Sequence, residues 1–227
     1  MRGYVICTEP RSGSALLCRL LTSTGVLGRP REYFNADAMR RFAGVVDYPL
    51  DPEGQLAAIP QMGATPNGVY GLKIFTHQFD FAKSTRWAAR LPSLSFVYLE
   101  RRDLLGQAIS HVRALQTQQW ISRVAAAVAP TYDQASINGQ LVRLASGHAR
   151  WRNYFARNGL PVLCLTYEAF VQSPQETVEA VGRWIGLSET PRIDISQLGG
   201  LEIQRDALSE AWRARFIAET RDLTILH

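Results

Sequence analysis

The sequence has few of the residues that mark disulfide-rich, metal-binding or membrane proteins. Its 227 residues include three cysteines and four histidines, all widely spaced, so neither a disulfide framework nor a zinc site is expected. The sequence lacks an apolar run of about 18 residues, so no transmembrane helix and no stable membrane insertion are expected. The apolar run at 3–7 is too short for a signal peptide. We therefore expect a cytoplasmic protein with reduced, mostly buried thiols.

Lysine is scarce, since only Lys73 and Lys83 among the 25 basic residues are lysines and the rest are arginines. The planar guanidinium group of arginine matches phosphate and sulfate oxygens in bidentate fashion. A GC-rich genome would produce the same bias, so the composition alone does not identify a ligand. The net charge of +5 is modest, and no basic run exceeds two residues. Nucleic acid is therefore not an expected partner.

Short apolar runs alternate with helical patterns along the chain, which predicts an α/β fold with a central parallel sheet flanked by helices. We expect one domain over residues 1–227. Residues 28–68 hold much of the proline, glycine, aspartate and asparagine and predict a loop-rich cap, with a short helix near 40–43, that carries acceptor specificity. Strands are expected at 4–8, 69–75, 95–99 and 161–166, and helices at 15–21, 79–90, 103–128, 137–156, 174–185 and 209–220.

A run of small and turn-forming residues joins the first expected strand to the first helix. Backbone N–H groups at such a junction, together with the helix dipole, favour an anion. Arg11 adds a positive charge, and Ser12 and Ser14 add hydroxyl donors. The run lacks the Gly-Lys pair of a nucleotide-binding Walker A loop. It predicts a phosphate loop of another kind, with a plain βα turn as the alternative; its residues are Pro10, Arg11, Ser12, Gly13, Ser14, Ala15 and Leu16.

Two further groups suggest chemistry. Arg101 and Arg102 follow the third expected strand, at the edge where open α/β sheets bind ligands, and Ser110 lies on the next helix. They form a candidate clamp for a second phosphate, with solvated arginines as the alternative. Glu32 lies between Arg31 and aromatic residues, just after the first helix. A carboxylate there is a candidate general base, with a surface ion pair to Arg31 as the alternative.

Motifs spread over nearly the whole chain resemble the bacterial trehalose 2-sulfotransferase family, a branch of the sulfotransferases that use 3′-phosphoadenosine-5′-phosphosulfate (PAPS). The resemblance implies the P-loop-NTPase-like sulfotransferase fold. It rests on several motifs in the family's order: 10–17 (PRSGSALL), 28–34 (GRPREYF), 65–73 (TPNGVYGLK), 101–103 (RRD), 107–110 (QAIS), 113–117 (RALQT) with Trp120, 165–168 (LTYE), and Gln204, Asp206 and Trp212.

The resemblance also implies roles for matching residues. The loop from Pro10 to Leu16 would hold the 5′-phosphosulfate of PAPS. Arg101 and Ser110 would hold the 3′-phosphate, with Arg102 as an alternative, and Tyr167 would contact adenine. Residues 203–227 would form a tail and helix that cover the cofactor through Gln204. Ile203 occupies the position of a family arginine, and Arg205 is the candidate replacement.

The implied reaction is in-line transfer of a sulfuryl group to a hydroxyl, with release of adenosine 3′,5′-bisphosphate (PAP) and no metal. Glu32 is the expected base and His77 the alternative. Arg11 would stabilise developing charge; Lys73 would either stabilise the leaving oxygen or pair with a carboxylate. Relatives of this kind form dimers, so a homodimer is expected.

The sequence leaves alternatives open for both the acceptor and the activity. Residues 34–65 and the connection after Trp120 are short for a disaccharide sulfotransferase, so the acceptor stays open among carbohydrates, glycolipids and small natural products. Trp120, Trp151 and Tyr48 are candidates for sugar stacking or for the core. The alternative functions are a small-molecule P-loop kinase, which would need Mg²⁺, and a PAP- or PAPS-binding protein without turnover.

Overall fold

The computed structural model of the chain describes residues 1–120, 128–198 and 207–221. These residues form two compact units. The first joins Met1–Arg102 to Gly147–Gly199, and the second joins Asp103–Ser146 to Gly200–His227. The division of the chain into domains stays a prediction.

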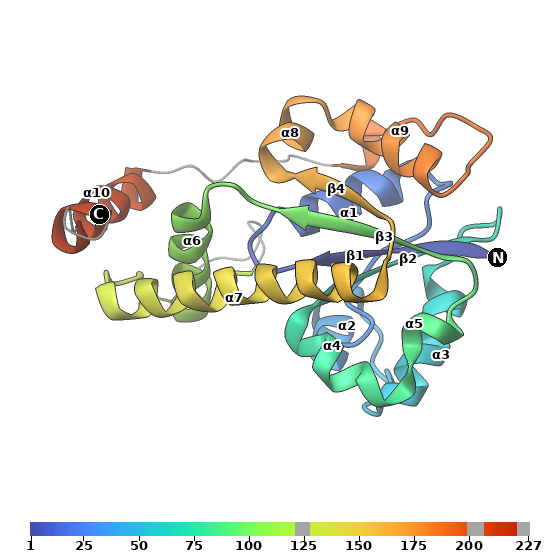
Figure 1. Ribbon diagram of the computed structural model, residues 1–227, viewed down its shortest axis with the longest axis horizontal. Coiled ribbons are helices and arrows are strands. Elements are labelled where there is room, and N and C mark those ends of the chain that lie inside the picture. The colour runs from blue at the N-terminus through green and yellow to red at the C-terminus, as the bar shows by residue number, and fades with distance from the viewer. Residues whose placement is uncertain (121–127, 199–206, 222–227) are drawn as a thin grey trace. The chain divides into compact units, whose positions relative to one another are not determined.

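The first unit is built on four parallel strands in the order β2-β1-β3-β4 (Figure 1). The strands are β1 (Arg2–Thr8), β2 (Val69–Phe75), β3 (Leu94–Glu100) and β4 (Val162–Thr166). Every residue of β2 and all but the first of β1 are buried, as expected for parallel strands covered on both faces. The predicted α/β class with a central parallel sheet is therefore confirmed.

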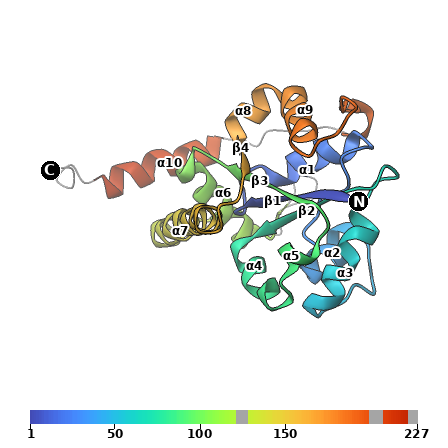
Figure 2. The same cartoon turned by 45° about the vertical axis from the view of Figure 1, so that its right-hand side comes forward.

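Helices cover both faces of this sheet (Figures 1 and 2). One face packs against α1 (Ser14–Ser23), α8 (Tyr167–Gln172) and α9 (Pro174–Trp184), through a cluster that includes Leu17 and Val178. The other face packs against a second layer around Trp87 and Trp151. That layer comprises α2 (Ala36–Ala43), α3 (Pro52–Gly63), α4 (Thr76–Ala82), the 3-10 turn η1 (Lys83–Thr85), α5 (Trp87–Arg90) and the last part of α7 (Gln134–Asn158).

The second unit is helical. It contains α6 (Leu104–Thr117), the first part of α7 and α10 (Ala207–Thr220), packed around a cluster that includes Ile109, Leu144 and Trp212. Asp103 caps α6, as predicted, by accepting the Gly106 backbone N–H at 2.9 Å. The same carboxylate accepts Arg213 Nη2 at 2.6 Å, so one side chain joins the start of α6 to α10.

The segment 28–68 is more helical than predicted, because α2 and α3 lie within it. The short helix expected near 40–43 coincides with the last part of α2. Each helix begins at a local cap: Asn35 accepts the N–H of Ala38, and Asp51 accepts the N–H of Gly54. The helices are short and their apolar residues are few, so sequence periodicity is weak. Their buried residues nevertheless join the core beside Tyr48.

The remaining expected helices differ mainly in their ends. The expected helix at 79–90 is broken, because Arg86 adopts a left-handed conformation with φ 53°. The helix expected to reach 128 ends at Thr117, where Gln118 also has a positive φ of 55°. The short helix α8 is not predicted by the sequence pattern. Among the helices that the structure describes, none has the length and apolar character needed to span a bilayer.

Thiol burial differs along the chain. Cys7 and Cys18 are buried and Cys164 is exposed on the edge strand β4, which agrees with the expectation of mostly buried thiols. Trp151 and Tyr48 belong to the core: the Trp151 indole donates to Thr8 O at 3.0 Å, and the Tyr48 hydroxyl donates to Tyr33 O at 2.8 Å.

A pair of glycines tests how tightly the segment after α1 packs on β2. Gly25 and Gly28 have φ values of +68° and +69°, but a Cβ at Gly25 would meet nothing within 4 Å. A Cβ at Gly28 would lie 2.7 Å from Gly71 N and 2.9 Å from Gly63 O. We expect Gly25→Ala to cost about 1 kcal/mol and Gly28→Ala about 3 kcal/mol or more in chemical denaturation. Equal losses would contradict this packing.

Candidate functional site

The loop between β1 and α1 has the backbone of an anion site. Arg11 and Gly13 adopt left-handed conformations with φ 64° and 83°. Turns of this kind bring backbone N–H groups together around an anion. Gly13 precedes α1, and within the described part of the chain this helix has no side-chain cap and no acidic residue in its first turn. The positive end of the helix dipole therefore faces the loop, and the first turn of α1 supplies no carboxylate to offset it.

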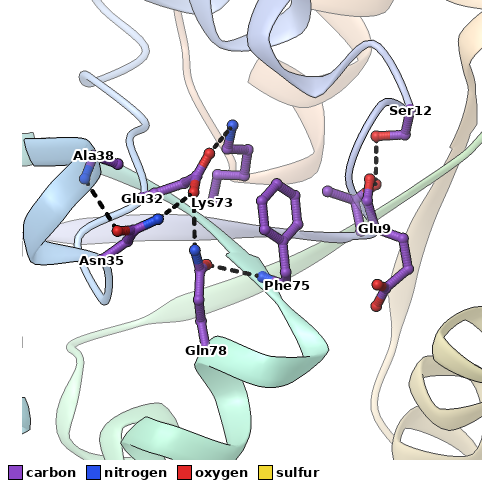
Figure 3. A network of polar contacts seen from close by, with 9 residues as sticks. Glu9, Ser12, Glu32, Asn35, Ala38, Lys73, Phe75 and Gln78 are labelled. Carbon is purple, nitrogen blue, oxygen red and sulfur yellow. Dashed lines mark hydrogen bonds and ion pairs between the residues drawn. The ribbon is translucent and has the colours of Figure 1, made fainter. Parts of the chain in front are cut away.

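Buried side chains hold this loop to the sheet. Ser12 Oγ lies 2.7 Å from Thr8 Oγ1, and Thr8 donates to Leu99 O at 2.7 Å. Glu9 is completely buried and accepts the Thr76 N–H at 3.3 Å. A Cβ at Gly147 would lie 2.4 Å from Glu9 Cδ, so α7 packs directly on this carboxylate. The loop is thus anchored to β1, to α4 and to α7. Figure 3 shows the side chains of Glu9 and Ser12 at this loop.

Two predicted cofactor residues of the first unit, Arg101 and Tyr167, lie together beside the loop. The Arg101 guanidinium carbon lies 5.0 Å from the centroid of the Tyr167 ring, and Arg101 Nη1 lies 3.5 Å from Arg11 O. A Cβ at Gly13 would lie 2.3 Å from Tyr167 Cδ2. Glycine is therefore required at this position both by the positive φ and by the tyrosine ring.

The other predicted cofactor residues lie elsewhere or are not described. Arg102 is exposed, and its backbone N–H donates to Glu168 Oε2 at 3.2 Å. Ser110 is half-buried on α6, in the second unit. Gln204 and Arg205, together with Ile203, lie outside the described residues.

Glu32 is the centre of a polar network (Figure 3). Its Oε1 lies 2.7 Å from Lys73 Nζ on β2. Its Oε2 accepts two amides, Gln78 Nε2 at 2.9 Å and Asn35 Nδ2 at 3.0 Å. The ion-pair partner of Glu32 is therefore the buried Lys73, which corrects the alternative of a surface pair with Arg31.

This network keeps Glu32 ionised. Burial alone would raise the pKa of the Glu32 carboxyl, but Lys73 and the amides of Gln78 and Asn35 outweigh burial and lower it. Burial likewise opposes the charge on Lys73, but Glu32 raises the pKa of Lys73 overall. The pKa of the Glu32 carboxyl is therefore shifted away from neutrality, opposite to the direction that favours a general base at neutral pH.

His77 lies at the start of α4 and is exposed. Its ring centroid lies 5.7 Å from that of Phe75, and Lys73 Nζ lies 5.1 Å from the same Phe75 ring. The Phe75 ring thus contacts both Lys73 and the alternative base.

Sequence reasoning missed three residues of this site. Asn35 follows the Glu32 motif and is the cap of α2, so its position carried a signal. Glu9 directly follows an apolar strand, where a carboxylate is unusual enough to notice. Gln78 carried no signal, because its contacts with Glu32 and Phe75 arise only when β2 turns into α4.

Two other features bear on ligands. Trp120 is half-buried and its ring lies 5.9 Å from His111, so of the three aromatic candidates it alone keeps accessible surface. Within residues 1–120, 128–198 and 207–221, no group of three or more metal-ligating side chains occurs.

Comparison with known proteins places these features in a family context. The family model described as Stf0 sulphotransferase matches residues 3–219. A trehalose 2-sulfotransferase of Mycobacterium tuberculosis (strain ATCC 35801 / TMC 107 / Erdman) is 30% identical over 264 positions, covering 96% of this chain and 96% of the relative. A trehalose 2-sulfotransferase of Mycolicibacterium smegmatis (strain ATCC 700084 / mc(2)155) is 28% identical, covering 94% and 93%.

The alignment to the first relative is longer than the 227 residues of this chain, so that relative carries insertions that this chain lacks. Among solved structures, the sulfotransferase domain from the curacin biosynthetic pathway has a TM-score of 0.53 at 14% identity. The match covers 92% of this chain and 82% of that domain, and it shows a shared fold.

The buried pair can be tested by a double-mutant cycle. We expect Lys73→Met to cost about 3 kcal/mol of unfolding free energy at pH 7, because it leaves the Glu32 charge buried without its partner. Adding Glu32→Gln should recover part of that loss, with a coupling of about 1–3 kcal/mol. The exposed pair Arg90–Glu53, also at 2.7 Å, is the control and should show about 0.5 kcal/mol or less.

The coupling should also depend on pH. The pKa of Glu32 is lowered on folding, so the contribution of the pair is complete above the ordinary pKa of 4.5. It should be lost as the pH falls through the lower pKa of the folded state. A coupling that is equal for the two pairs, or unchanged in acid, would contradict the burial of the Glu32–Lys73 charge.

Proposed function

Because the chain belongs to the Stf0 sulfotransferase family, we propose that it transfers a sulfuryl group from PAPS to a hydroxyl of a carbohydrate, glycolipid or small natural product. The observation that supports this most is the β1–α1 loop, where Arg11 and Gly13 adopt left-handed conformations directly before the N-terminus of α1. Lys73, which pairs with Glu32, lies on β2 in register with Ile6 of β1, the strand that leads into this loop.

The residues present fit a nucleotide with two separate anionic groups. The N-terminus of α1 and Arg11 suit the 5′-phosphosulfate, through the loop from Pro10 to Leu16. The Arg101 guanidinium can bind the 3′-phosphate, and the Tyr167 ring beside it can stack on adenine. In this proposal Ser110 completes the 3′-phosphate site, with Arg102 as the alternative, and Gln204 and Arg205 belong to the covering tail.

Glu32 is the proposed general base. When bound, PAPS supplies the sulfuryl group, and PAP leaves with the electron pair of the broken S–O bond. Glu32 accepts the proton of the acceptor hydroxyl as the oxygen bonds to sulfur. Arg11 and Lys73 place positive charge where negative charge develops on the leaving side. Lys73 also lowers the pKa of Glu32, so a shift of Lys73 toward the donor would make Glu32 more basic.

The acceptor is proposed only by class. The curated relatives are named trehalose 2-sulfotransferases, so trehalose is the first acceptor to test. The chain lacks insertions of those relatives, so a different hydroxyl acceptor is equally compatible with the proposal. A homodimer remains an expectation from the resemblance to the family, and a cytoplasmic location remains an expectation from the sequence.

Cofactor binding is tested by calorimetry with PAP in the absence of Mg²⁺. We expect binding at about micromolar strength, weakened at least about tenfold by Arg11→Ala and by Arg101→Ala, since each removes a charge-assisted contact worth about 1.5–3 kcal/mol. Arg90→Ala, which removes an exposed ion pair with Glu53, is the matched control and should bind like wild type. ATP–Mg²⁺ binding without PAP binding would favour a kinase. PAP binding without turnover on any acceptor would favour a binding protein.

The base is tested by Glu32→Gln and His77→Ala, with labelled PAPS and a panel of acceptors that begins with trehalose. We expect Glu32→Gln to lower kcat by about a hundredfold or more, with PAP affinity within about twofold of wild type. His77→Ala should change kcat by less than about threefold, because His77 is exposed and its ring lies beside Phe75, whereas Glu32 is at the centre of the buried network. The reverse ranking would assign the base to His77.

A further inference from the structure

We propose that Gln78 is a positioning residue that holds the Glu32 carboxylate ionised and oriented, and that links it to the loop that binds the donor. The inference rests on the proposed function, because it gives Gln78 a role through Glu32. The link runs through the β2–α4 corner, which we define as residues 75–78.

The side-chain amide of Gln78 is fixed at both ends. The residue is 2% exposed, its Oε1 accepts the Phe75 backbone N–H at 3.0 Å, and its Nε2 donates to Glu32 Oε2 at 2.9 Å. A carboxylate only accepts hydrogen bonds, and a backbone N–H only donates. The amide can therefore satisfy both partners in one orientation alone, and a flipped amide would satisfy neither.

The next N–H of the same corner is bound by the donor loop. Thr76 N donates to Glu9 Oε1 at 3.3 Å, and Glu9 is completely buried at the start of that loop. Two successive backbone N–H groups are thus bound by two side chains, one from α4 itself and one from the end of β1. The corner therefore ties the proposed base to the loop that would hold the sulfuryl donor.

The contacts also distinguish the two oxygens of Glu32. Oε2 accepts the amides of Gln78 and Asn35, and the Asn35 amide is itself fixed, because its Oδ1 accepts the Ala38 N–H at 3.0 Å. Two donors occupy both lone pairs of Oε2. Oε1 pairs with Lys73, which leaves it one lone pair within the described part of the chain. Oε1 is therefore the oxygen that would accept the hydroxyl proton.

Few other groups near Glu32 titrate close to neutral pH. Lys73 on β2 faces Glu32 and has a raised pKa, and Arg11 of the loop acts on Lys73. The Cys18 thiol on α1 faces the pair, and burial raises its pKa to about 11. His77 on α4 is exposed beyond Phe75. A change in the titration of Glu32 can therefore be separated from that of its neighbours, with His77→Ala as a check.

The decisive measurement is the pKa of Glu32 itself, by NMR of the protein labelled with ¹³C at glutamate carboxyls and assigned with Glu32→Gln. We expect Gln78→Leu to raise this pKa, because the Gln78 hydrogen bond lowers it in wild type. Gln78→Glu should raise it further, because a second carboxylate would face Glu32. PAP affinity should stay within about twofold, since Gln78 does not line the loop.

Gln55→Leu is the matched control. Gln55, on α3, is also a buried glutamine and is 1% exposed. Its Nε2 donates to Pro49 O at 2.9 Å. The Gln55→Leu variant should lose stability as Gln78→Leu does, but it should leave the pKa of Glu32 unchanged. With trehalose as the probe acceptor, Gln78→Leu should lower kcat about tenfold, which corresponds to one hydrogen bond to a charged group.

The outcomes separate the two proposals. An unchanged Glu32 pKa in Gln78→Leu, or an equal change in Gln55→Leu, would overturn the role of Gln78. Full activity of Glu32→Gln would instead overturn Glu32 as the base, whatever the NMR result. The NMR measurement needs no acceptor, so it decides the positioning role even if trehalose is not sulfated.

Discussion

The buried ion pair between Glu32 and Lys73 is the constraint on which the rest of the site depends. Lys73 lies in a strand whose other residues are almost all apolar, so its charge needs a partner at the same depth. The backbone supplies that partner, because the Lys73 N–H donates to Arg31 O at 2.9 Å and so sets the next residue, Glu32, beside the lysine. The close approach of Gly28 to β2 belongs to the same arrangement.

The β1–α1 loop, the second part of the site, is built on a different physical principle. The β1–α1 loop uses backbone conformation and a helix terminus rather than paired charges, and its side chains Glu9 and Ser12 point into the protein as anchors. Binding groups that come from the backbone stay in place when a ligand leaves, because neither anchor depends on the ligand. The two halves meet at residues 75–78, where both the loop and the carboxylate network contact one turn of chain.

The sequence allowed the sheet to be predicted well and the layer over its second face poorly. The expected strand at 69–75 coincides with β2, because a strand buried on both faces is a continuous apolar run. The first half of α2 and all of α3 were missed because local caps at Asn35 and Asp51, rather than a long apolar stripe, start these helices. Motifs identified Glu32 and Lys73 separately, but their pairing and the part played by Gln78 depend on contacts between distant segments.

The contacts of Glu32 suggest how the proposed base can keep its position in chains of different length. Lys73 and Gln78 belong to β2 and α4, which are parts of the sheet scaffold, and Asn35 is the first cap after the Glu32 motif. None of these contacts involves α3 or the connection into it. Insertions between α2 and β2 could therefore reshape the acceptor side without moving the proposed base.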